Sequence, residues 1–200
     1  MPAASTLEVD LYTRGDTGAL RQVDASSNDN AVLGWHGGVV YRNLAASTAH
    51  TNTTTEALFD AQFSIPANTL KAGSVIEVEY QGIATATTNS DTTTIKLYIG
   101  GLGGTALLTG TATDAASNSI FAGKWKGIVR TIGTAGTIVG FGHHVEVPAA
   151  SGTAVIDITE ILASTAINTE TAQVIGVGCD FSVADTGDSA RLDVLIVKIY

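Results

Sequence analysis

The segment 56–101 constrains the fold of this chain most, because it contains three runs in which apolar and polar residues alternate at every second position. Successive side chains of a β-strand point to opposite faces, so each run predicts a strand with one buried and one solvated face. We therefore expect a wall of antiparallel sheet here. The apolar faces of the three strands are Phe59, Ala61, Phe63 and Ile65; Ile76, Val78 and Tyr80; and Ile95, Leu97 and Ile99.

Strand signals continue along the chain, at residues 7–13, 105–109, 124–132, 137–147, 155–158, 172–183 and 191–200. Gly133 and Gly136 favour a tight hairpin, because glycine supplies positive φ without steric cost. No helical pattern is long enough for a βαβ unit, although residues 159–166 fit a helical turn. The pattern predicts an all-β fold, an antiparallel β-sandwich or jelly roll. We expect its interior to contain Phe59, Phe63, Ile76, Val78, Leu97, Ile99, Phe141, Val177 and Phe181.

The first quarter of the chain differs from the rest. Residues 1–55 have little periodicity, and the polar stretches 24–30 and 47–55 are typical of loops. We predict an extended N-terminal arm with short strands at 1–55 and one jelly-roll domain at 56–200. The arm either attaches to a partner or folds back onto its own domain; both alternatives remain open at this stage.

The last predicted strand is apolar on both faces. Leu192, Val194 and Ile196 alternate with Leu195, Val197 and Ile199. An antiparallel strand of this kind is covered on both sides, so the outer face needs the arm or a neighbouring subunit. We expect a homotrimer. The predicted interface residues are Leu7, Val9 and Leu11, which would add a strand to a neighbour, Trp35 as an aromatic anchor, and Leu195, Val197 and Ile199 of the last strand.

Composition limits the partners. The chain has 200 residues and a net charge of −9, and an acidic protein repels phosphate backbones, so we expect no nucleic-acid partner. No apolar run has the length of a membrane span, so we expect no membrane partner. The first ten residues have neither a basic nor a hydrophobic region, and we expect no secretory signal. With only Cys179, the chain has no intrachain disulfide.

The histidines and the cysteine, which could bind a metal or act in catalysis, are better explained by structural roles. His143 and His144 point to opposite faces of one strand and cannot converge on one metal ion. We expect His143 in the core or an interface, with Val139, Phe141 and Val145, and His144 on the other face with Glu146. Cys179 shares a face with apolar residues and is predicted to be a buried, unreactive thiol.

Weaker motifs add little. The integrin-type tripeptide at 14–16 is too short to carry a function, and the Asp/Asn groups lack the spacing of a known calcium loop. Tryptophan occurs only at Trp35 and Trp125, which is sparse for a sugar-stacking surface. We find no catalytic motif, so we predict no enzyme, no cofactor and no metal. The oxygen-ligand groups considered are Asp24, Asn28, Asp29 and Asn30, and Asp180, Asp185 and Asp188.

Two stretches carry a resemblance to a known class of proteins. Residues 63–101 read FSIPANTLKAGSVIEVEYQGIATATTNSDTTTIKLYIGG, and residues 129–142 read VRTIGTAGTIVGFG. They resemble structural proteins of tailed bacteriophages, in which an IPANTLKAG turn, a Thr/Asn-rich loop, an LKLYLGG-like strand and an RTIG-TGTVVG hairpin follow one another. The resemblance covers the middle half of the chain. It implies a jelly-roll virion component: a head decoration (cement) protein, a head fibre or a tail-associated protein.

The resemblance implies a function and a location. A decoration protein stabilises the head by bridging subunits of the major capsid protein, and it lies on the capsid surface of the virion after synthesis in the host cytoplasm. The alternative is a head-fibre or tail-fibre module that binds a host receptor or surface glycan. A carbohydrate-active enzyme on the same fold is a third reading, which would need converging carboxylates that the sequence does not show.

Overall fold

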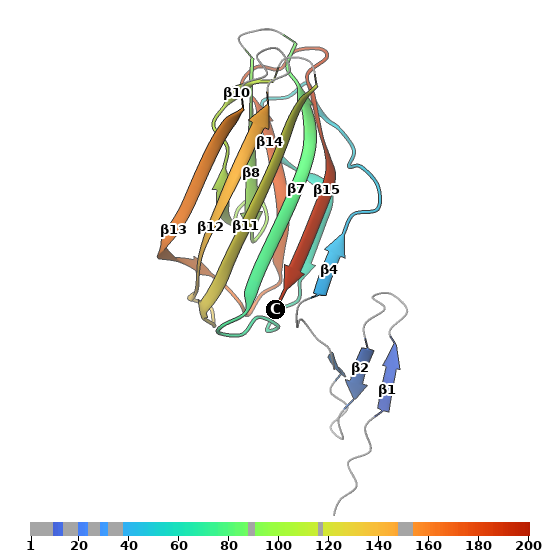
Figure 1. Ribbon diagram of the computed structural model, residues 1–200, viewed down its shortest axis with the longest axis vertical. Helices are drawn as coiled ribbons and strands as arrows, with labels where there is room; N and C mark the ends of the chain where they lie inside the picture. Colours follow the sequence, from blue (N-terminus) through green and yellow to red (C-terminus); the bar gives the residue numbers. More distant parts are fainter. Residues whose placement is uncertain are drawn as a thin grey trace, which may run out of the picture.

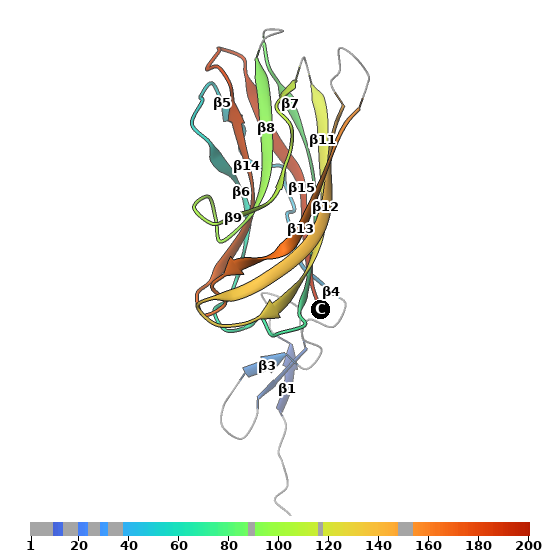
Figure 2. The same ribbon diagram turned by 90° about the vertical axis from the view of Figure 1, so that its left-hand side faces the viewer.

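Two antiparallel sheets pack face to face in this protein, whose structure is a computed structural model (Figures 1 and 2). It describes residues 10–13, 20–23, 29–31, 38–87, 91–115, 118–147 and 154–200, with side chains described from residue 40 onward except at 158–164. The chain passes repeatedly from one sheet to the other, and all pairings are antiparallel. The predicted all-β sandwich of the jelly-roll type is confirmed.

The larger sheet has seven strands and faces the viewer in Figure 1. Its order is β13 (Val155–Ile167), β12 (Gly136–Val147), β11 (Ser119–Thr131), β7 (Val75–Thr85), β15 (Ser189–Ile199) and β4 (Gly38–Arg42), and β5 (His50–Thr51) also pairs with β15. The helical turn expected at 159–166 is wrong, because these residues pair with β12 as part of β13.

The smaller sheet has five strands. Its order is β10 (Thr113–Asp114), β8 (Thr92–Ile99), β14 (Gln173–Phe181) and β6 (Ala57–Ile65), and β9 (Thr105–Thr109) pairs with the same edge of β8 as β10. The three strands predicted most directly from alternation, β6, β7 and β8, thus belong to two different sheets. Their apolar faces meet in the middle of the sandwich.

The N-terminal strands form a third, small sheet. β1 (Asp10–Thr13), β2 (Leu20–Val23) and β3 (Asp29–Ala31) pair in this order and with no strand of the sandwich. β4 and β5, in contrast, belong to the seven-stranded sheet. The domain boundary expected at residue 55 therefore lies too late: the sandwich already includes the chain from residue 38.

The core confirms most of the predicted interior. Seven of the nine expected side chains, all except Phe63 and Phe141, are at most 2% exposed. Phe63 is half-buried and stacks on Tyr41 of β4, with ring centroids 5.5 Å apart. Phe141 is 52% exposed, so its predicted burial is wrong. The inward face of β12 instead carries Gly140, Gly142, His144 and Glu146.

Glycines explain this choice of face. Trp125 of β11 is fully buried, and a Cβ added at Gly127, Gly140 or Gly142 would collide with its indole. The same relationship links Phe121 to Gly82 and Tyr80 to Gly123, each pair being directly opposite in the register. Large inward aromatic rings thus lie over glycines, and the ring of Trp125 fills the interior above Gly140 and Gly142 of β12.

A β-bulge resolves the two-faced pattern of β15. The register shifts between Leu192 and Val194, so Leu192 joins Leu195, Val197 and Ile199 on the inward face, and all four are buried. Val194 and Ile196 remain half-buried on the outer face. Asn43 and Ser47 satisfy the backbone of β15 beside the bulge: the Asn43 amide oxygen accepts from Leu195 N–H at 2.6 Å, and Ser47 Oγ accepts from Leu192 N–H at 2.9 Å.

Candidate interaction surface

The two adjacent histidines point to opposite faces of β12, as predicted, but the core position that was one of the two alternatives for His143 is wrong. His144 is fully buried, whereas His143 is exposed. The Tyr80 hydroxyl lies 3.0 Å from His144 Nδ1, and Glu146 Oε2 lies 3.9 Å from Nε2. Thr113 donates its hydroxyl to Glu146 Oε2 at 2.6 Å. These contacts join β7, β12 and β10 inside the sandwich, so the cluster has no opening to a substrate and holds the two sheets together.

The other chemical candidates are also part of the framework. Cys179 is fully buried, as predicted, and burial raises the pKa of its thiol. Asp188 is buried and accepts hydrogen bonds from Thr87 N–H and from Asp185 N–H. Burial first, and then Asp91, raises the pKa of Asp185. Within the described ranges no three His, Cys, Asp or Glu side chains are placed to hold a metal ion, and no helix is long and apolar enough to cross a membrane.

Of the predicted interface residues, only the three in β15 have described side chains. Leu195, Val197 and Ile199 are core residues of their own chain, which corrects the expectation that they contact a neighbouring subunit. Leu11 lies in β1, and its side chain is not described. Leu7, Val9, Trp35 and the tripeptide 14–16 lie outside the described residues, as do Asp24 and Asn28, while Asp29 and Asn30 lie in β3.

A surface that the sequence analysis missed is the outer face of the seven-stranded sheet. Its four central strands place their outward side chains in regular cross-strand rows. From β12 through β11 and β7 to β15, these rows are Val147, Ile120, Ile83 and Arg191; Val145, Ala122, Gln81 and Val194; His143, Lys124, Glu79 and Ile196; and Phe141, Lys126, Glu77 and Lys198. We call this set the outer grid.

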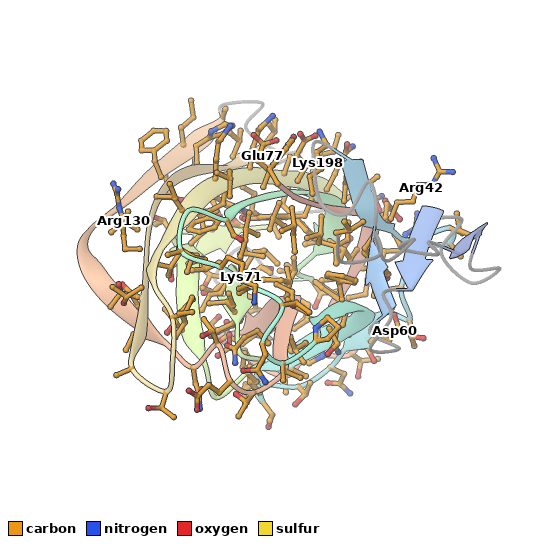
Figure 3. The ribbon with its side chains drawn as sticks, turned by 90° about the horizontal axis from the view of Figure 1, so that it is seen from below. Arg42, Asp60, Lys71, Glu77, Arg130 and Lys198 are labelled. Atoms are coloured by element: carbon orange, nitrogen blue, oxygen red, sulfur yellow. The ribbon has the colours of Figure 1, made fainter. Side chains whose placement is uncertain are left out.

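The lower two rows of the outer grid carry a ladder of charges. Lys126 Nζ lies 2.6 Å from Glu77 Oε1, and Lys124 Nζ lies 2.9 Å from Glu79 Oε1. Lys198 approaches Glu79 from the other side at 3.4 Å. The hydrogen bonds from Lys126 and Lys124 hold the pKa values of Glu77 and Glu79 below their usual range. Figure 3 shows Glu77 and Lys198 on the outside of the sandwich, away from the packed interior.

The upper two rows are mainly apolar. Ile120 is 48% exposed, and Ile156 of β13, directly beside Val145, is 62% exposed. Because Ala122 is smaller than its neighbours, a shallow depression of about 250 Å³ lies over it, lined also by Gln81, Lys124, His143, Val145 and Val194. Contiguous exposed apolar side chains beside a patterned set of charges are typical of protein–protein contact surfaces.

Comparisons with known proteins identify no family. No family model and no curated protein matches the sequence. Among solved structures, the CBM2 module of the evolved Dit of Lactobacillus casei BL23 phage J-1 is similar, with a TM-score of 0.34 and 9% identity over 76% of this chain and 74% of that chain.

Two other similar structures come from different sources. The infectious bursal disease virus Gt strain structure has a TM-score of 0.34 and 14% identity, and the match covers 95% of this chain and 41% of that chain. Winged bean acidic lectin, complexed with methyl-α-D-galactose, has a TM-score of 0.31 and 11% identity over 98% of this chain and 92% of that chain. At these TM-scores the likeness identifies neither a family nor a function.

Proposed function

We propose that this chain is a non-enzymatic structural protein of a tailed-bacteriophage virion, and that it decorates the head by bridging major capsid protein subunits. The observation that carries the proposal is the position of the phage-like stretches in the fold. Residues 63–101 run from the end of β6 through β7 and β8, and residues 129–142 form the hairpin between β11 and β12. The resemblance therefore falls on the strands that build both layers of the sandwich.

The polar groups of the interior support a structural role rather than catalysis. His144 and Glu146 are buried and engaged with Tyr80 and Thr113, and Cys179 is a buried thiol. A nucleophile needs access to substrate and an adjacent base, which these side chains do not have. The net charge of −9 opposes contact with packaged DNA, so an outer position on the capsid suits the chain.

The N-terminal segment is the proposed attachment element. Since β4 and β5 belong to the sandwich, the arm is shorter than the sequence indicates and ends before residue 38. Among the described strands, β1–β3 pair only with one another, so they offer a second structural unit in addition to the sandwich. A decoration protein with two such units can contact more than one capsid subunit, and the added interface resists the outward pressure of the packaged genome.

The alternative is a fibre or tail module that binds a host receptor or surface glycan. The depression over Ala122 favours it, because Gln81, Lys124 and His143 place hydrogen-bonding groups around a small apolar floor. The two functions predict different copy numbers. A decoration protein covers the head in many copies, whereas a fibre protein occupies one vertex or the tail in few copies.

Electron microscopy of intact particles, with an antibody against this chain, separates the two functions. Label distributed over the whole head supports decoration, and label confined to a vertex or the tail supports the alternative. Absence of the chain from purified particles contradicts both.

A truncation tests the attachment element. A chain beginning at residue 38 should keep its circular dichroism spectrum but lose binding to purified heads. A chain beginning at residue 51 is the comparison, and it should be less stable because it lacks the side chains of Asn43 and Ser47 beside the bulge. Full head binding by the first truncation would contradict the attachment role.

A further inference from the structure

The outer grid has a symmetry that its individual contacts do not reveal. The main path of the large sheet contains six strands, and its midline runs between β11 and β7. On one side of this midline β11 presents lysines, and on the other side β7 presents glutamates at the same heights. Farther out, β12 and β15 both present apolar residues, such as Val145 and Val194 in the same row.

We propose that the outer grid binds the same face of a second copy of this chain, about a two-fold axis that runs along the strands between β11 and β7. Such an axis places β11 of one copy over β7 of the other and β12 over β15, while each row meets its own equivalent. The resulting interface is isologous, with every contact made twice. This inference concerns self-association and does not rest on the capsid proposal.

The charges are complementary in this arrangement. Lys124 of one copy meets Glu79 of the other, and Lys126 meets Glu77, so in each of the two rows the two ion pairs form one four-charge network across the interface. A two-fold axis perpendicular to the strands would instead place the glutamates of β7 over those of the second copy. Like charges in contact strongly oppose association, so one orientation is selected.

The apolar residues are complementary in the same arrangement. Ile120 meets Ile83, and Val145 meets Val194. In the lowest row, Phe141, which is 52% exposed, meets the aliphatic stem and ammonium group of Lys198. The orientation that pairs opposite charges therefore also covers the exposed phenylalanine and the upper apolar rows.

Shape and net charge agree with a second copy as the occupant. Gln81, an exposed side chain, faces the depression over Ala122 of the other copy, and the exchange occurs twice. The chain carries −9 overall, and three of its five lysines lie on this face, so the net negative charge of each copy lies mainly away from the contact. Four strands by four rows span about 500 Å² per copy from strand spacings, or about 1,000 Å² in total, which is the size of a weak, reversible interface.

The oligomeric state gives the first test. Sedimentation equilibrium of the full chain should yield twice the monomer mass of 20.4 kDa. This outcome would replace the trimer expected from the sequence by a two-fold pair. A monomer at millimolar concentration, or a trimer, overturns the proposal.

Charge reversal tests whether the charged rows of the outer grid lie in the contact. One chain carries Glu77→Lys with Glu79→Lys, and the other carries Lys124→Glu with Lys126→Glu. Each variant alone should dimerise roughly 100-fold more weakly at low salt, because like charges then face each other, and an equimolar mixture should form a heterodimer. A variant that loses dimerisation because it is unfolded should not regain it on mixing. Circular dichroism of each variant shows whether it is folded, and the mass of the mixture shows whether a heterodimer forms. Folded variants that fail to recover on mixing overturn the proposal.

Cysteine pairing tests the register. Val145 and Val194 lie three strand spacings apart within one chain, about 14 Å, which is too far for an intrachain disulfide. The double variant Val145→Cys with Val194→Cys should oxidise to a covalent dimer. Gln62→Cys, exposed on the other sheet, is the matched control and should remain monomeric under the same conditions. Equal dimer yield from the control, or no dimer from the double variant, overturns the predicted register.

Discussion

The Asp157 carboxylate accepts two hydrogen bonds from Thr111, one from its backbone N–H at 2.7 Å and one from its hydroxyl. This pair fastens the segment between β9 and β10 to the edge strand β13, and so it joins the two sheets on one side of the sandwich. Asp60 holds Thr48 in the same way on the other side, and Asp188 holds Thr87. Three aspartate–threonine contacts thus fix segments that no strand pairing secures.

A double-mutant cycle on the first of these contacts measures its strength. Thr111→Val and Asp157→Ala should each lower the free energy of unfolding by about 0.5–1.5 kcal/mol, since both partners lie near solvent. The double variant should cost less than the sum, because each change removes the same hydroxyl bond. Urea denaturation provides the values, and Thr109→Val, at the exposed end of β9, is the control with an expected change near zero. Fully additive losses would show that the two residues do not act together.

The Tyr80 hydroxyl is expected to contribute more, because its contact with His144 lies inside the sandwich. Tyr80→Phe keeps the ring over Gly123 but leaves His144 Nδ1 without its partner. An unsatisfied buried polar atom costs about 1–3 kcal/mol, so thermal and chemical denaturation should both show a loss of this size. Tyr41→Phe is the matched control, since the Tyr41 hydroxyl has no hydrogen-bond partner among the described residues. Equal effects of the two substitutions would rule out a special role for the interior contact.

Gly140→Ala tests the packing of Trp125. The added methyl would collide with the indole, and Trp125 has no free space in which to move because it is fully buried. Overpacking of this kind costs about 3 kcal/mol, and the tryptophan fluorescence of the folded variant should also change. Gly103→Ala, where nothing lies within 4 Å of the added carbon, should leave both the stability and the spectrum unchanged.

The same glycines explain for which strands the buried side chains could be predicted from the sequence and for which they could not. In β6, β7 and β8 large apolar side chains alternate with polar ones, so size and face agree and the predicted burial was right for Ile76, Val78 and Leu97. In β12 the side chain of Phe141 points outward, because Trp125 from β11 occupies the space above Gly140 and Gly142. A pattern within one strand does not contain that information.

The outer grid could not be predicted from single strands either, because it depends on the register between strands. Glu77 and Lys126 are far apart in sequence, and nothing in either strand alone sets them side by side. The bulge between Leu192 and Val194 also changed which residues of β15 face outward, so the interface residues predicted there proved to be core residues. The existence and type of most strands could be predicted, whereas the grid they form required the pairing of strands distant in the chain.

The last prediction concerns pH. Burial, followed by the charge of Asp91, raises the pKa of Asp185 above its ordinary value of 3.8. A carboxyl whose pKa is raised on folding contributes stability below its unfolded pKa, and this contribution is lost as the pH rises through the folded pKa. At pH 7 the ionised Asp185 therefore opposes folding.

Asp185→Asn should raise the melting temperature at pH 7, because the neutral amide removes the repulsion from Asp91 and Asp188. The difference from the unsubstituted chain should shrink as the pH falls and vanish below about pH 3, where both chains are neutral at this position. Comparing the two chains at each pH cancels the acid destabilisation expected from Asp60, Glu77 and Glu79, whose pKa values are lowered. Asp193→Asn is the control, since it removes an ion pair with Arg191 and should give no gain at pH 7. A pH-independent gain from Asp185→Asn would assign the effect to something other than its ionisation.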